Sequence, residues 1–177
     1  MKQKGFILFF ALVFLVILSL LGISMFGGFI TNQKLVGNFR EKSRAVDAAQ
    51  TALDTAQYWM SQPANTYSGN WVTGSPCTTV SSTPVICSNT LANPTTLPWA
   101  VYSAFTPSGM TVNASGGANS YAAGVNYYIQ FMGTTSANPP TAVYQVTSTA
   151  QGGNAQAVAV LQAVYQVQAL ARDIGGG

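Results

Sequence analysis

The residues that most often carry out chemistry are scarce in this chain. It has no histidine, and its only carboxylate side chains are Glu41, Asp47, Asp54 and Asp173. General acid/base catalysis normally uses histidine or paired carboxylates, zinc sites use histidine and cysteine clusters, and calcium sites use several carboxylates. We therefore expect a protein that is not an enzyme and that needs neither a metal ion nor another cofactor.

The two cysteines, Cys77 and Cys87, are the side chains whose spacing does indicate chemistry. They lie in a stretch rich in serine, threonine and proline. In an oxidising compartment an even pair at short separation most simply forms a disulfide, which would stabilise the fold by roughly 2–3 kcal/mol. Two buried free thiols would risk oxidation there, and a redox pair would normally show a CxxC spacing, which is missing. We expect a Cys77–Cys87 disulfide.

The compartment is indicated by the amino-terminal stretch. Lys2 and Lys4 precede an apolar run, residues 6–30, that contains no charged residue. As a helix this run would be about 37 Å long, enough to cross a hydrocarbon core of about 30 Å. A secretory signal would have a shorter core and a small-x-small cleavage site after it, which residues 31–34 do not supply. We expect a single transmembrane helix with its basic end on the cytoplasmic side.

Charge is confined to the two ends of the chain. Only 6% of the residues are charged, and every residue from Thr55 to Ala171 is uncharged. The net charge of +3 therefore belongs to the membrane-proximal part. Because the remainder has no basic patch that could neutralise phosphates, we expect no nucleic-acid binding. Its length fits one globular head, which we place at residues 62–177.

Helical periodicity continues beyond the apolar run. One helical face carries regularly spaced apolar residues: Val46, Ala49, Leu53, Ala56 and Met60. This pattern predicts an amphipathic half over residues 31–61, and Pro63 provides the stop. The spacing of Arg44 and Asp47 predicts an ion pair one turn apart.

Three later segments alternate or are rich in apolar residues, as strands are: residues 125–131, 143–150 and 158–170. Turn sequences join them, which predicts an antiparallel meander. Residues 99–105 could add a strand, and residues 63–98 read as loops with one or two short strands, in which Trp71 and Trp99 are local core anchors. The apolar last strand suggests either a central position or contact with the helix. The fold class is α+β, with a long helix packed on an antiparallel sheet.

The order Lys2-Gln3-Lys4-Gly5 followed by Phe6-Ile7-Leu8 resembles the leader of type IV pilins and pseudopilins. The resemblance implies a type IV pilin-like fold and a leader, residues 1–5, that the prepilin peptidase removes after Gly5. Phe6 would then be the first mature residue and would be N-methylated. The precursor would sit in the inner membrane as a single-pass protein with its amino terminus in the cytoplasm. A signal anchor without processing is the alternative.

Two internal elements narrow the resemblance: Gly37-Asn38-Phe39-Arg40, and an alanine-rich segment over residues 48–53. Together with the carboxy-terminal stretch TSTAQGGNAQAVAVLQAVYQV, they resemble the PilX minor pilins. The resemblance implies a role in type IV pilus assembly, other minor pilins and the major pilin as partners, and a place on the pilus or cell surface after assembly.

The fifth residue after the expected cleavage site is Phe10, where common major pilins have a glutamate. In that family the glutamate is thought to pair with the terminal amine of a neighbouring subunit inside the filament. A subunit without it fits a filament tip, so we expect a minor pilin that primes or caps assembly within a tip complex, with an adhesive role. The alternatives are a pseudopilin of a type II-like secretion system and a major structural or adhesive pilin.

Overall fold

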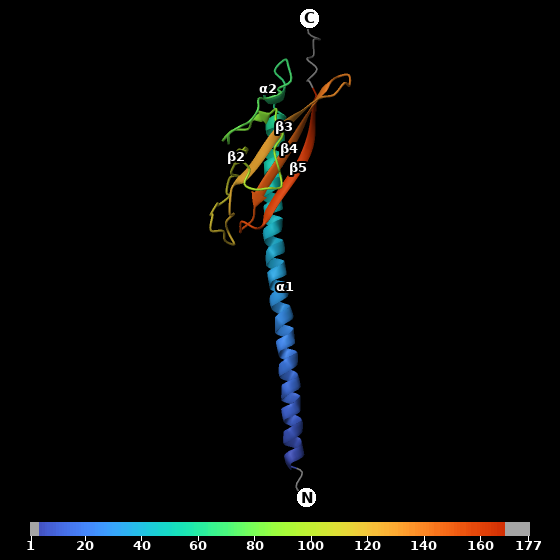
Figure 1. The fold of residues 1–177 in the computed structure, drawn as a ribbon, viewed down its shortest axis with the longest axis vertical. Helices are drawn as coiled ribbons and strands as arrows, with labels where there is room; N and C mark the ends of the chain where they lie inside the picture. Colours follow the sequence, from blue (N-terminus) through green and yellow to red (C-terminus); the bar gives the residue numbers. More distant parts are fainter. Residues whose placement is uncertain (1–3, 169–177) are drawn as a thin grey trace. The chain divides into compact units, whose positions relative to one another are not determined.

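The structure is a computed structural model that describes residues 4–168, without the side chains of residues 4, 5, 26 and 27. Two helices and five strands follow in order: α1 (Lys4–Met60), α2 (Pro63–Thr66), β1 (Ile86–Cys87), β2 (Ser103–Phe105), β3 (Val125–Thr134), β4 (Thr141–Gln151) and β5 (Val158–Gln168). The chain groups into two units that divide between Arg40 and Glu41, within α1. The second unit, which we call the head, contains the sheet and the last turns of α1 (Figure 1). The fold is α+β, as expected.

Helix α1 is 57 residues long and ends one residue before the predicted Ser61. No proline interrupts it, and Pro63 stands shortly after its end. Pro63 does not lead into a loop but opens the short helix α2, because proline fits the first helical position, where its missing N–H costs nothing.

The sheet has the order β1-β3-β4-β5, with β2 also paired to β3. Strands β3, β4 and β5 pair antiparallel in sequence order, so the predicted meander is confirmed (Figure 1). The short β1 pairs parallel to β3, and β2 pairs antiparallel to it. The strand suggested for residues 99–105 is limited to Ser103–Phe105. The last two residues of the predicted strand 158–170 lie outside the described residues.

Strand β5 ends the order of strands, so the central position suggested for it is wrong; β3 and β4, which pair on both sides, are the inner strands. The second explanation for its apolarity, contact with the helix, is correct. The side chains of Leu161, Ala163, Tyr165 and Val167 are partly buried against the core cluster to which α1 contributes. The alternate residues Gln162, Val164 and Gln166 are exposed.

The face of α1 that packs on the sheet is built mainly from alanine. Its buried residues are Ala45, Ala48, Ala49, Ala52, Leu53, Ala56 and Met60. The predicted face was therefore wrong at Val46, which is 37% exposed, and it missed three alanines. Small side chains let the helix backbone come close to the sheet, and the Ser148 hydroxyl on β4 donates a hydrogen bond to the Ala49 carbonyl at 2.8 Å.

The two faces of β3 belong to two separate clusters. Val125, Tyr127 and Ile129 pack with the α1 alanines, whereas Tyr128 points to the opposite side and packs with Cys87 and Trp99. We call that opposite side the outer face of the sheet. The predicted role of Trp99 as a core anchor is confirmed, and Trp71 is partly buried against the main core. The loop between β1 and β2 therefore covers part of the outer face.

Candidate functional site

The amino-terminal unit presents a long apolar surface. Phe6 is 68% and Phe10 56% exposed, and their rings lie 4.9 Å apart, one helical turn from each other. Large apolar side chains are exposed all round the helix through residue 30, and Leu35, Val36 and Phe39 continue this exposure. By length and composition, α1 is the one helix among the described residues that could cross a membrane. Such a surface is suited to lipid or to the apolar faces of other helices.

The predicted cleavage residues both lie at the beginning of α1, and the backbone of Gly5 is already helical. Position 10 has the uncharged aromatic side chain of Phe10 in place of the glutamate that common major pilins have there. The first charged residue of α1 after Lys4 is Lys34.

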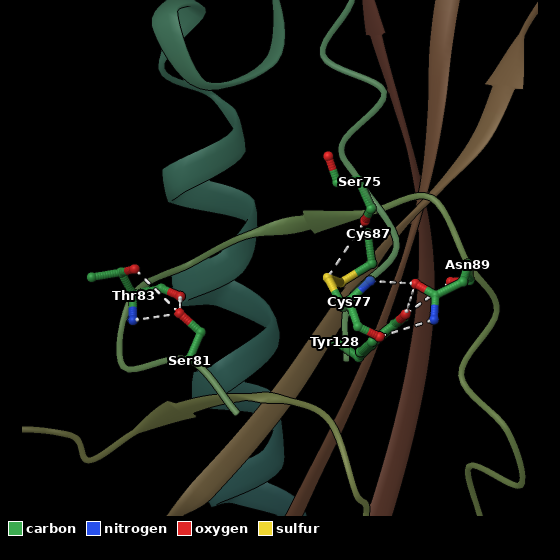
Figure 2. The surroundings of a disulfide bond; sticks show 7 residues. All are labelled: Ser75, Cys77, Ser81, Thr83, Cys87, Asn89 and Tyr128. Atoms are coloured by element: carbon green, nitrogen blue, oxygen red, sulfur yellow. Dashed lines mark hydrogen bonds between the residues drawn. A yellow bond between two sulfur atoms is a disulfide. The ribbon is translucent and has the colours of Figure 1, made fainter. Parts of the chain in front are cut away.

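The predicted disulfide is present. Cys77 and Cys87 are joined, with their Cα atoms 5.3 Å apart. Cys87 is buried on β1, which pairs with β3, whereas Cys77 comes from the preceding loop. The bond therefore fastens the loop to the sheet on its outer face (Figure 2).

The Asn89 side chain holds the same loop from the other side. Its Oδ1 accepts a hydrogen bond from the Cys77 amide at 2.8 Å, and its Nδ2 donates to the Cys77 carbonyl at 3.1 Å. The Tyr128 hydroxyl of β3 donates toward Asn89, 2.8 Å from its carbonyl oxygen and 2.9 Å from Oδ1 (Figure 2). Asn89 thus pairs with the Cys77 backbone as a neighbouring strand would and connects it to the sheet.

The tip of the disulfide loop is also fixed. The Ser81 hydroxyl donates to the Thr83 carbonyl at 2.7 Å and accepts from the Thr83 amide at 3.1 Å (Figure 2). The backbone of Ser81 bonds to that of Tyr102 and Ala104, beside and within β2. At Gly74, φ is +71° and a Cβ atom would collide with the Ile86 carbonyl, so glycine permits the close approach of the chain to β1. The loop is therefore a structured part of the head.

The charged residues of α1 fasten the helix to two loops of the head. Arg44 pairs with Glu41 at 3.1 Å, not with Asp47 as predicted, because Arg44 is directed toward the loop before β3. There it donates to the Ser120 carbonyl at 2.8 Å and lies over the Tyr121 ring at 4.6 Å. Glu41 accepts from the Gly153 amide in the β4–β5 turn. These charged side chains therefore form contacts within the head.

Burial keeps the tyrosines of the core neutral. It raises the pKa of Tyr127 and of Tyr144 to about 12. The Tyr144 hydroxyl donates to the Val72 carbonyl at 2.9 Å and so ties the segment after α2 to β4. Burial also raises the pKa of Tyr165, and the nearby Asp54 carboxylate adds to this. At neutral pH these hydroxyls are protonated, and that of Tyr144 acts as a hydrogen-bond donor.

The described residues contain no group of three or more histidine, cysteine, aspartate or glutamate side chains that could hold a metal ion. Sequence reasoning found the cysteines but missed the residues that position them, Asn89 and Tyr128. The alternation of β3 was a usable signal for Tyr128, because it places that tyrosine on the face away from the helix. No local signal pointed to Asn89, whose partners are brought to it by the fold.

Comparison with known families gives two matches. The family model described as "Type IV pilus assembly protein PilX C-term" matches residues 46–167, and the one described as "PilX N-terminal" matches residues 4–54. No curated protein and no solved structure matches the chain. The first match begins on the alanine face of α1 and ends on β5, so it includes the helix–sheet packing described above. The matched ranges together cover nearly all the described residues, and the chain belongs to the PilX family of type IV pilus assembly proteins.

Proposed function

We propose that this protein is a minor pilin that primes or caps type IV pilus assembly as part of a complex at the filament tip. Membership of a pilus assembly family supports a role among other pilus components. The observation that carries the finer proposal is Phe10, which leaves the first turns of the mature helix without a carboxylate. Burying the terminal amine of a subunit in the helix bundle of the filament is costly unless a carboxylate of a neighbouring subunit pairs with it. A subunit that lacks this carboxylate therefore suits the filament tip, where no further subunit follows.

The proposal includes processing in the inner membrane. The precursor would cross that membrane once, with its amino terminus in the cytoplasm, and the prepilin peptidase would cut between Gly5 and Phe6 and methylate Phe6. Lys2 and Lys4 support this orientation, since basic residues stay on the cytoplasmic side. The oxidised Cys77–Cys87 pair agrees with a head outside the cytoplasm. After assembly the head, which has no charged residue from Thr55 to Ala171, would be exposed on the pilus, where it could serve adhesion.

Deletion of the gene tests the assembly role. Loss of a priming subunit should sharply reduce the number of pili per cell, while the pili that form keep a normal diameter because the major pilin still elongates them. Electron microscopy gives the count, and epitope labelling in the wild type gives the position of the subunit. Label spread evenly along every filament at near-stoichiometric density would overturn the proposal in favour of a major structural pilin. Unchanged piliation with loss of protein secretion would instead identify a pseudopilin.

Intact-mass measurement tests processing. The wild-type protein from piliated cells should begin at a methylated Phe6. Gly5→Leu should leave the leader attached, because the peptidase must accommodate a small residue there. Gly22→Leu is a matched control in the same helix, since no atom lies within 4 Å of a Cβ placed at Gly22. A wild-type chain that keeps Met1 would contradict the proposal.

Phe10→Glu tests the tip argument directly. A subunit at the filament tip, with no further subunit beyond it, should gain little from a carboxylate. Piliation should therefore stay near the wild-type level, or the variant subunit should be found along the filament shaft. Epitope labelling distinguishes these two outcomes. A complete loss of pili in this variant, with normal amounts of the protein, would show that the apolar Phe10 itself contacts a required partner, contrary to the proposal.

A further inference from the structure

A cavity of about 630 Å³ opens on the outer face of the sheet, and neither Cys77 nor Cys87 lines it. One wall is the segment before β2, with Leu97, Trp99 and Tyr102. The floor and the other wall come from the start of β3, the end of β4 and the turn into β5. A volume of this size lies within the range of small-molecule sites, which is roughly 300–1,000 Å³.

The lining carries hydroxyl and amide groups but no charge. Its polar side chains are Thr95, Tyr102, Asn126, Thr149 and Gln151. The nearest charges bond to the backbone of the β4–β5 turn: Glu41 to the Gly153 amide and Lys42 to the Val158 carbonyl. Neither belongs to the lining. Because a phosphate or carboxylate ligand would need arginine or lysine and a cation would need carboxylates, the chemistry of the lining selects an uncharged polar ligand.

Some polar side chains elsewhere on the same face are already paired with each other. Gln162 donates to Thr147 at 3.1 Å, Gln130 lies 3.4 Å from Thr90, and Tyr128 bonds to Asn89. Within residues 4–168, the side chains of Tyr102, Asn126 and Gln151 make no such bond. Their donors and acceptors are therefore free for a ligand.

Thr149 sharpens this contrast. It is 3% exposed, and its hydroxyl is the one buried side-chain polar atom in the described part of the chain without a hydrogen-bond partner. A buried hydroxyl without a partner costs about 1–3 kcal/mol. Its position two residues after Thr147 on β4 places it on the outer face, at the floor of the cavity. Because the hydroxyl is buried in the free protein, contact with a ligand on that floor requires it to turn about the Cα–Cβ bond.

The apolar part of the lining completes the match to one ligand class. The Trp99 indole N–H already donates to the Pro94 carbonyl at 2.9 Å, so this side chain offers the cavity only its apolar surface. Leu97 and Val158 add further apolar area. A pyranose ring has an apolar C–H face and a rim of neutral hydroxyls that both donate and accept hydrogen bonds. The C–H face could pack on the apolar walls, and the hydroxyls could bond to the free amides and hydroxyls of the lining.

We propose that this cavity is a binding site for a neutral sugar ring, held by Asn126, Gln151 and Tyr102 at the rim and by Thr149 at the floor. The proposal deepens the adhesive part of the proposed function and rests on that function only for its biological setting. Binding to the isolated chain does not depend on where the subunit sits in a pilus. Sugar binding and pilus assembly can therefore fail independently.

The test is a titration of the intact chain, in lipid nanodiscs free of sugar-based detergent, with the methyl glycosides of glucose, mannose, galactose and N-acetylglucosamine. Saturation-transfer NMR should detect saturable binding of at least one neutral glycoside, and none of sialic acid or a sugar phosphate. Absence of saturable binding by every neutral glycoside at tens of millimolar, or equal binding of the charged sugars, would overturn the proposal.

Thr149→Val and Thr147→Val form a matched pair for the site. Thr149→Val should weaken glycoside binding about three- to tenfold without lowering the melting temperature, because the hydroxyl that it removes has no partner in the free protein. Thr147→Val should lower the melting temperature and leave binding unchanged, since its hydroxyl accepts from Gln162 and is not part of the lining. The exposed Ala155→Trp should block the cavity and abolish binding. Binding unchanged in both Thr149→Val and Ala155→Trp would place the sugar elsewhere and overturn the proposal.

Discussion

The side of the sheet that meets α1 is covered by small apolar side chains, whereas part of the outer face is covered by a loop held through a disulfide and hydrogen bonds. On the first side the alanines of α1 pack against Val125, Tyr127 and Ile129. On the second, Cys87 and Tyr128 fasten the segment around Asn89. On the helix side, close apolar packing makes the fold sensitive to any change in side-chain volume. On the outer face, the loop is held by one disulfide and a few hydrogen bonds, so its position depends on each of them. The two faces should therefore fail through different substitutions.

The largest effect of a single substitution is expected from a volume increase on the helix side. Ala49 is fully buried, and its carbonyl accepts the Ser148 hydroxyl, so Ala49→Leu must push α1 away from β4. We expect a loss of about 3 kcal/mol in the free energy of unfolding. Denaturant unfolding of the intact chain in nanodiscs gives the value. The neighbouring Gln50 is exposed, so Gln50→Leu is the control, and equal stability of the two variants would refute the close helix–sheet contact.

On the outer face, Cys77→Ser should lower the free energy of unfolding by about 2–3 kcal/mol, because the short loop is no longer closed in the unfolded chain. Mild reduction of the wild-type protein should give the same loss, which serves as the control for the substitution. Non-reducing peptide mapping should find the Cys77–Cys87 link in protein taken from outside the inner membrane. Free thiols at both positions would contradict the prediction that a disulfide holds the loop on the outer face.

High pH should weaken the helix side. The pKa of Tyr127 and Tyr144 is about 12 in the folded protein and about 10 in the unfolded chain, so the unfolded state loses its protons first. Stability should be unaffected below pH 10 and should then fall by about 1.4 kcal/mol per pH unit for each tyrosine. Unfolding measured from pH 9 to pH 12 checks this slope. Replacing both residues by phenylalanine should flatten it, and an unchanged slope in that variant would assign the loss to other groups.

The smallest effects compare one hydroxyl on each face. Tyr144→Phe removes the bond to Val72 on the helix side, and Tyr128→Phe removes the bonds to Asn89 on the outer face. Each should cost about 1 kcal/mol of unfolding free energy. Only Tyr128→Phe should also speed hydrogen exchange at the Cys77 amide, because Asn89 then loses its tie to β3. Tyr58 is exposed, and Tyr58→Phe provides the neutral reference. Equal exchange at Cys77 in all three variants would argue against the connecting role of Asn89.

The sequence by itself determined the features that follow from local periodicity and composition. The uncharged apolar run of residues 6–30 is read directly from the sequence. The spacing of apolar residues, together with proline and turn residues, predicted the end of the helix near Pro63 and the three meander strands. The disulfide was predicted from an even pair of cysteines at short separation in a compartment expected to be oxidising. Each of these depends on residues that are close together in the chain.

Only the tertiary structure decided which residues far apart in the sequence come into contact. Val46 lies outside the core because alanines form the face of α1 that meets the sheet. Strand β5 ends the order of strands because, among the described strands, only β4 pairs with it. Arg44 turns from Asp47 to Glu41 because the carbonyl of Ser120 and the ring of Tyr121 lie on that side. The unpaired Thr149 hydroxyl and the cavity above it arise from segments far apart in sequence. Sequence spacing cannot reveal such sites, because their geometry exists only after the loop has folded over the outer face.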